Sequence, residues 1–361
     1  MGTKKKIAWL DTVRVFASFA IVVAHYLMCQ GFETYPFTRR ICFDLAGAGV
    51  FLFFAISGYL VVGSLNRSPN VLDFCKRKVI RIVVPFAVSF IFLGGLFLFA
   101  GVFDMEIAEQ SPFYKVLYNH DYFVNLICIF PIDMNLFVWL GIEFLPFVGE
   151  WFMGVILLMY FVAPPLKACA ERAPLITLAA SIAVSFVVFD ATKNTNVGYN
   201  WWLVLVRIPE FLFGMILAIK HDAILKYRIE FELASIFIIG AYTVHFLAQK
   251  LPVGFMFFVY EPKVFFLTMP TIFLCFSLFE RLNRLPSDLL SRFNDLAGIS
   301  YPIMLIQHPM IFLFEAQLNF EELHSWGIFF VLIVLTWMIV YLSGFVKRFS
   351  EPAENFFLRR A

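Results

Sequence analysis

Apolar runs long enough to cross a bilayer recur along the whole chain and are separated by short polar segments. A helix needs about 20 consecutive apolar residues to cross the hydrocarbon core, so the pattern predicts about ten membrane-spanning helices. We place them near residues 7–29, 44–65, 79–103, 150–167, 175–190, 201–219, 231–249, 263–279, 297–318 and 326–346. The expected fold is all-α: a polytopic transmembrane helix bundle that forms a single integral membrane domain over residues 1–361.

Residues 104–149 fit this pattern least well. The segment is apolar, but polar residues and prolines interrupt it at positions 131, 133, 135, 143 and 146. Backbone groups left unpaired in lipid are costly. We therefore expect interfacial or re-entrant pieces here rather than a further pair of spans.

The basic residues are distributed unequally between the two sides of this layout. Twenty of the 28 Lys and Arg residues fall on the side of the N-terminus, six fall on the opposite side, and Arg14 and Arg207 lie within spans. Loops rich in Lys and Arg stay in the cytoplasm. The pattern predicts cytoplasmic termini and a multi-pass protein of the cytoplasmic (inner) membrane.

The composition agrees with a membrane protein, because 61% of the residues are apolar and 15% are charged. Soluble domains have about 45–50% and about 25%. The basic residues occur in short separate groups, so nucleic acid is not expected as a partner. The six cysteines form no Cys-x-x-Cys pair, and no His or Cys spacing suggests a metal site.

The first predicted span carries a polar stripe. At 100° per residue, Asp11, Arg14, Ser18 and His25 fall within an arc of about 60° on an otherwise apolar helix. A charge at the bilayer centre costs about 2.5–3.5 kcal/mol on insertion scales, so we expect the stripe to face the bundle interior or a wet cavity. In a purely structural alternative, Asp11 pairs with Arg14 and His25 bonds a neighbouring helix. The alignment of the whole set favours function.

Two further segments carry candidate binding groups. In "FFAISGYL" at 53–60, Gly58 favours close helix packing and Ser57 is placed to line a cavity. In "CKRKVIRIVVP" at 75–85, Arg77 and Arg81 are spaced i,i+4 at the cytoplasmic end of a span. They suit membrane anchoring, or a phosphate clamp, because guanidinium forks match phosphate geometry.

Later spans hold more polar groups. Arg207 and Glu210 are one turn apart, which predicts an internal ion pair with a structural role. His308 lies about 11 residues into its span, near mid-bilayer. Glu150, at the head of the fourth span, is the best-placed carboxylate on the outer side for binding a hydroxyl-bearing acceptor.

Several of these segments together resemble the membrane-bound acyltransferase family 3, whose members acylate surface polysaccharides, lipids and other acceptors. The motifs are the Arg14-to-His25 spacing in "LDTVRVFASFAIVVAH", the "SGYL" of 53–60, and the basic segment leading into Pro85. They continue with "WFMGVILLMYFVAPPL", "RIPEFLFGMILA" and "SYPIMLIQHP", in the family's order, up to about residue 309. Many members carry a Glu or Gln before the Tyr of the fourth helix, where this chain has Leu158 and Met159. The chain looks like the stand-alone form, without the appended hydrolase-like domain of some members.

The resemblance implies an acyl-CoA-dependent O-acyltransferase, most similar to O-acetyltransferases that use acetyl-CoA. The acyl group would pass to a hydroxyl of a cell-surface glycan or lipid-linked sugar. His25 would act as general base or acyl carrier, and Arg14 would guide the donor or polarise its thioester. The remaining candidates are Asp11, His308 and Glu150 for catalysis and Arg77, Arg81 and Ser57 for CoA. Membrane lipid and a second copy in a homodimer are further partners compatible with this interpretation.

Two other classes of function remain open from the sequence. A polytopic transporter or flippase of envelope glycan precursors would use a similar cavity, but the internal repeats typical of transporters are not evident. A non-catalytic membrane partner in envelope assembly would leave the polar stripe unexplained.

Overall fold

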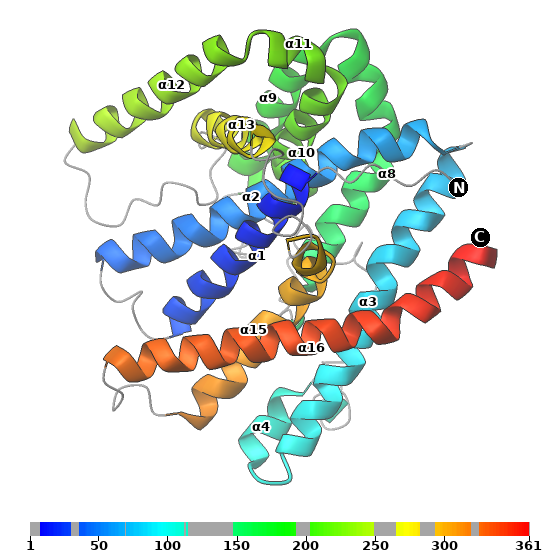
Figure 1. Cartoon of the computed structure of the whole chain (residues 1–361), viewed down its shortest axis with the longest axis vertical. Coiled ribbons are helices and arrows are strands. Elements are labelled where there is room, and N and C mark those ends of the chain that lie inside the picture. The colour runs from blue at the N-terminus through cyan, green and yellow to red at the C-terminus, as the bar shows by residue number, and fades with distance from the viewer. Residues whose placement is uncertain are drawn as a thin grey trace. The chain divides into compact units, whose positions relative to one another are not determined.

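The computed structural model describes residues 8–29, 36–68, 70–111, 113–114, 147–192, 203–248, 265–281, 293–318 and 325–360. These residues form helices and turns, and no strand occurs among them (Figure 1). The helices are α1 (Ala8–Cys29), α2 (Pro36–Asn66), α3 (Val71–Ala100), α4 (Met105–Gln110), α8 (Glu150–Arg172), α9 (Pro174–Thr192), α10 (Val204–Ile219), α11 (His221–Lys226), α12 (Arg228–Ala248), α13 (Phe265–Arg281), α15 (Ser300–Gln317) and α16 (Ser325–Arg360). The all-α prediction is confirmed for this part of the chain.

Every predicted span coincides with one of these helices. Within the described ranges, six helices are long and apolar enough to cross a membrane, namely α1, α2, α3, α8, α9 and α16. Helix α13 is apolar over a shorter stretch, Phe265–Leu278. The chain is therefore a membrane-helix protein, while the count of ten spans and the cytoplasmic location of both termini stay predictions.

Three helices are longer than the apolar runs that predicted them. Helix α2 begins at residue 36 instead of 44, α3 begins at 71 instead of 79, and α16 ends at 360 instead of 346. Hydropathy marks where a helix meets lipid, whereas capping and backbone hydrogen bonds decide where it ends. The start of α3 is fixed by Asn70, whose side chain accepts a hydrogen bond from the Asp73 amide at 2.8 Å.

The region 104–149, which follows α3, is described only at its two edges. The short helix α4 is capped by Asp104, whose carboxylate accepts from the Glu106 amide at 3.0 Å. The Ser111 hydroxyl then donates to the Gly94 carbonyl at 2.9 Å, which ties this segment back to α3. Residues 115–146 of this region lie outside the described residues, so the interfacial or re-entrant pieces predicted for 104–149 stay a prediction.

The chain forms two compact units, each made of segments that are distant in sequence. The first comprises Met1–Arg67, Ala163–Phe189 and Leu205–Ser300. The second comprises Ser68–Val162, Asp190–Val204 and Tyr301–Ala361. The prediction of a single domain over the whole length stays a prediction.

The core of the first unit joins α1, α2, α10 and α13, and α1 and α2 run side by side (Figure 1). Its buried side chains are Leu10, Val13, Phe51, Ala55, Ile56, Leu217, Ile272, Phe273 and Phe276. Burial of these apolar side chains draws the four helices together.

The second unit is built around α3, which packs against α16. The Phe92 and Phe345 rings join these two helices, with centroids 5.2 Å apart. Phe90 of α3 contacts Phe113 and Phe147 edge-on, at 5.6 Å and 6.0 Å. Aromatic side chains with large buried area therefore hold this unit together, in accord with a chain rich in phenylalanine.

Candidate functional site

The polar stripe of α1 lies on the packed side of that helix. The Ser18 side chain is completely buried, and the side chains of Asp11 and Arg14 are 19% and 28% exposed. The opposite side is marked by Phe16, which is 54% exposed and stacks on Phe293 with ring centroids 6.3 Å apart. The stripe is thus turned away from the exposed face of α1, as expected because charged side chains that face lipid are costly.

The charged end of the stripe is an intrahelical ion pair. Arg14 Nη1 lies 3.4 Å from Asp11 Oδ1, at the i,i+3 spacing. The Ser18 hydroxyl donates to the Arg14 carbonyl at 2.9 Å, so its hydrogen bond belongs to the helix backbone. Asp11 therefore holds the Arg14 guanidinium beside the helix.

The other end of the stripe carries the imidazole. His25 is half-buried and lies 11 residues beyond Arg14, which is about 16 Å along a helix axis at 1.5 Å per residue. The four stripe residues therefore share one helix and one packed face, as predicted.

The Ser57 segment meets α10 at a close crossing. A Cβ on Gly58 would overlap the Phe211 carbonyl, and a Cβ on Gly214 would overlap the Ala55 carbonyl. The two glycines thus let the backbones of α2 and α10 touch, which confirms the packing role predicted for Gly58. Ser57, half-buried, precedes this contact in α2.

The predicted ion pair of α10 is present and fully enclosed. Arg207 Nη1 lies 3.3 Å from Glu210 Oε1, with side chains 5% and 0% exposed. The guanidinium also lies over the Phe51 ring of α2, 4.9 Å from its centroid. In the described part of the chain, Glu210 Oε2 has no hydrogen-bond partner. Burial on this scale is costly, so the pair fits a positional role at the α2–α10 crossing.

Arg77 and Arg81 belong to the second unit. Both lie in the first three turns of α3, so the i,i+4 spacing is helical as predicted. Arg77 is half-buried and donates from Nη2 to the Ser68 hydroxyl at 2.7 Å. Arg81 is exposed and interacts electrostatically with Glu354 of α16. Each guanidinium retains donors beyond these contacts.

A proline just after the two arginines is accommodated by α15. Pro85 lies inside α3, where it donates no backbone hydrogen bond and crowds the preceding turn. The Tyr301 hydroxyl of α15 donates to the Ile82 carbonyl in that turn at 3.1 Å. A neighbouring helix therefore satisfies a backbone group near the proline, as prolines in membrane helices require.

The remaining two candidates also lie in the second unit. His308 is half-buried near the middle of α15 and packs edge-on against Phe312, with ring centroids 4.5 Å apart. Glu150 is the first residue of α8, after Gly149, which has a positive φ of 76°. The side chain of Glu150 lies outside the described residues. That the candidates of the two units form one site stays a prediction.

The comparison with protein families decides what this helix bundle is. A family model described as an acyltransferase domain, of acyltransferase family 3, matches residues 7–344. The match contains the stripe and every other candidate residue. This chain belongs to acyltransferase family 3.

A curated relative adds a named activity over part of this acyltransferase. An O-acetyl transferase of Shigella phage Sf6 is 35% identical over 89 residues. Those residues are 24% of this chain and 26% of the relative, so the alignment spans about a quarter of each. No solved structure matches the chain.

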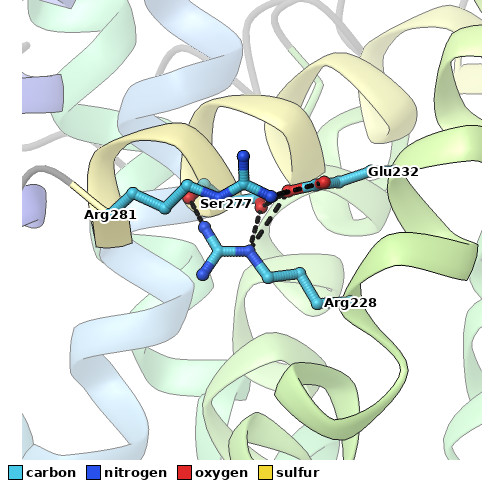
Figure 2. A network of polar contacts seen from close by, with 4 residues as sticks. All are labelled: Arg228, Glu232, Ser277 and Arg281. Atoms are coloured by element: carbon cyan, nitrogen blue, oxygen red, sulfur yellow. Dashed lines mark hydrogen bonds and ion pairs between the residues drawn. The ribbon is translucent and has the colours of Figure 1, made fainter.

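The acyltransferase also contains a polar network that the sequence analysis did not single out. Figure 2 shows Glu232 of α12 accepting from Arg228 Nε at 3.1 Å and from Arg281 Nη2 at 2.7 Å. The Ser277 hydroxyl of α13 bonds Glu232 as well, and Arg228 donates to the Ser277 hydroxyl and carbonyl. The signal was present in the i,i+4 spacing of Arg228 and Glu232 at the start of a span. The network joins α12 to α13 and contains no candidate residue.

Proposed function

We propose that this acyltransferase is an acyl-CoA-dependent O-acyltransferase, with acetyl-CoA as the donor. It transfers the acyl group from the cytoplasmic side to a hydroxyl of a cell-surface glycan or lipid-linked sugar. The observation that carries this proposal is the buried stripe of α1, in which Arg14 and His25 lie on one packed face of a family 3 chain. The phage relative is named an O-acetyl transferase, which supports a hydroxyl group as the acceptor.

The donor enters by its charged end. Arg77 and Arg81 contact the phosphates of CoA, because guanidinium groups form paired hydrogen bonds with phosphate oxygens. Ser57 lines the path of the pantetheine arm. Arg14, oriented by Asp11, points a donor at the thioester carbonyl oxygen and stabilises the negative charge that develops there.

The acyl group is then transferred with the help of His25. As a general base, the imidazole removes the acceptor hydroxyl proton while the oxygen attacks the thioester carbonyl carbon. The C–S bond breaks, and the CoA thiolate leaves and recovers the proton from the imidazolium. In the covalent alternative, an imidazole nitrogen attacks the thioester carbonyl carbon, the C–S bond breaks and CoA leaves as the thiolate. The acceptor hydroxyl then attacks the acyl-imidazolium, the C–N bond breaks to restore the imidazole, and the hydroxyl proton passes to the thiolate. Glu150 and His308 serve the acceptor side, by binding its hydroxyls or relaying its proton.

The test is transfer of labelled acetyl from acetyl-CoA to envelope fractions by the purified protein in lipid nanodiscs. His25→Ala should lose about 10²–10⁴-fold of the transfer rate, the range contributed by a positioned general base. His245→Ala, which removes a histidine of α12 without a proposed role, is the matched control and should transfer normally. If folded, inserted His25→Ala protein transfers at the wild-type rate, the assignment of His25 is wrong.

A further inference from the structure

A cavity separate from the stripe lies within the first unit. It has a volume of about 530 Å³ and is lined by residues of α9, α10, α11, α12 and α13. That volume is within the about 300–1,000 Å³ typical of small-molecule sites. Aromatic side chains such as Phe213, Phe231 and Phe273 form much of its wall, and neither Arg14 nor His25 lines it. It is a second candidate binding site on the same chain.

The wall of this cavity is open on one side and almost entirely apolar. Among the lining residues, Leu175 is 77% exposed, Phe266 is 58% exposed and Phe231 is 46% exposed. Water gains few hydrogen bonds in such a space, and apolar cavities stay dry or hold apolar ligands. In a membrane-helix protein the natural occupant of an apolar space with an open side is a lipid acyl chain.

One basic residue lies at the edge of this apolar lining. Among the described lining residues Lys220 alone is charged, and it lies at the corner between α10 and α11. Its backbone fixes this corner, since its amide donates to Ile216 and its carbonyl accepts from Ile224, both at 2.9 Å. Among the described residues, no carboxylate lies within ion-pair distance of its ammonium group. Tyr227 also lines the cavity.

A second cation lies close to the lining. Lys226 Nζ lies 5.4 Å from the centroid of the Tyr227 ring, so a second ammonium group lies beside a residue of the lining. The nearby carboxylate of Asp222 is fully exposed and lies 3.1 Å from His221 Nδ1, and it does not line the cavity. The cavity thus combines an almost entirely apolar wall with one lysine and one tyrosine in its lining, and a second lysine lies beside that tyrosine.

We propose that this cavity binds an anionic phospholipid of the surrounding membrane. One acyl chain lies along the apolar wall, and the headgroup phosphate contacts Lys220 and the Tyr227 hydroxyl. The charge of Lys220 selects an anionic headgroup over a zwitterionic one. The positive-inside prediction places Lys220 at the cytoplasmic leaflet, where anionic lipids attract basic groups. The proposal concerns lipid binding and does not depend on acyl transfer.

The experiment uses the full-length protein in nanodiscs of phosphatidylcholine with added phosphatidylglycerol that carries a photoreactive group in one acyl chain. Crosslinked peptides are mapped by mass spectrometry. The expected result is crosslinking to cavity-lining peptides of α10, α12 and α13 that unlabelled phosphatidylglycerol displaces better than unlabelled phosphatidylcholine. Lys220→Gln should weaken that displacement about fivefold, the effect of one lysine near an anionic surface.

Two further variants make the outcomes decisive. Ala234→Phe places a ring in the cavity from α12 and should abolish crosslinking without removing any charge. Lys347→Gln, a lysine of α16 in the second unit, is the matched control and should leave displacement unchanged. Equal displacement by the two lipids, or a Lys220→Gln protein that behaves as wild type, would mean that any lipid fills the space and would overturn the proposal. Because no readout is catalytic, an inactive protein would not affect the conclusion.

Discussion

Single residues in this chain divide into those that the helix itself satisfies and those with donors left for a ligand. Ser18 belongs to the first group, because its hydroxyl bonds the backbone of its own helix, and one carboxylate oxygen of Glu210 is likewise paired within α10. Arg77 and Arg81 belong to the second, since each guanidinium has five donors and the contacts described above engage only some of them. This difference separates a positional ion pair from a candidate binding group.

The proposed contacts of Arg77 and Arg81 with the CoA phosphates give a prediction for single residues. Arg77→Ala and Arg81→Ala should each weaken CoA binding about 10-fold to 100-fold, because each removes a charged hydrogen bond worth about 1.5–3 kcal/mol. The affinity, measured by calorimetry at several salt concentrations, should also become less salt-dependent.

Arg77 has a structural contact that needs its own control. Ser68→Ala removes the partner of its 2.7 Å hydrogen bond and keeps the guanidinium. That variant should bind CoA nearly as the wild type does. If Ser68→Ala weakens binding as much as Arg77→Ala does, the arginine acts by holding the start of α3 and not by contacting phosphate.

At this scale the sequence predicted pairs within one helix and missed pairs between helices. The Asp11–Arg14 and Arg207–Glu210 pairs follow from helical periodicity, and both are present. The network of Glu232 with Ser277 and Arg281 joins positions about 45–49 residues apart. Periodicity places residues on a helix face but does not say which neighbouring helix meets that face.

At the scale of elements, the crossing of α2 and α10 is a close helix contact of the kind that the sequence predicted at Gly58. Gly58 and Gly214 bring the two backbones together, and the Arg207 guanidinium lies over Phe51 a little further along. The crossing therefore joins two motifs of the family resemblance, "SGYL" and "RIPEFLFG". The two motifs are needed together for packing, apart from any catalytic role, because Gly58 of α2 contacts the backbone of α10 and Gly214 of α10 contacts the backbone of α2.

This crossing predicts a stability defect from the smallest possible change. Gly58→Ala and Gly214→Ala should each destabilise the protein by about 1–3 kcal/mol or more, since a methyl group would meet a backbone carbonyl that cannot rotate away. Thermal denaturation of the purified variants, followed by tryptophan fluorescence, measures the effect.

A glycine in open space supplies the control for these two variants. Gly240 lies in α12, and nothing would lie within 4 Å of a Cβ added there. Gly240→Ala should keep or slightly raise the melting temperature, because alanine favours a helix by about 1 kcal/mol over glycine. Equal melting temperatures for all three variants would contradict the close crossing.

Helix ends were the least predictable feature among the elements. The apolar run that predicted 79–103 gives no sign that α3 starts at residue 71, because that start depends on the Asn70 cap and not on hydropathy. The earlier start matters for function, since it makes Arg77 and Arg81 part of a helix and sets their spacing. Similarly, α16 continues past Lys347 through Pro352, where the apolar run has ended.

For the whole molecule, the side of the membrane on which each basic segment lies decides from which side the donor enters. CoA carries several negative charges and does not cross lipid unaided, so the proposed contacts of Arg77 and Arg81 with its phosphates require both arginines to lie on the cytoplasmic side. Arg77 and Arg81 fall on that side only if the N-terminus is cytoplasmic. The excess of 20 basic residues over six between the two sides favours this orientation strongly.

Fusion reporters test this orientation directly. Green fluorescent protein joined after residue 361 should fluoresce, and alkaline phosphatase joined there should be inactive, because both report a cytoplasmic end. The same reporters joined after Lys250, in a predicted outer loop, should give the opposite result. Alkaline phosphatase activity at the C-terminus would place the arginine pair of α3 on the outer side or remove one of the ten spans. In the first case the route of the donor would have to start from the opposite face, with His25 nearer the entrance than Arg14. A second reporter joined directly after Arg67, which is cytoplasmic only in the second case, separates the two.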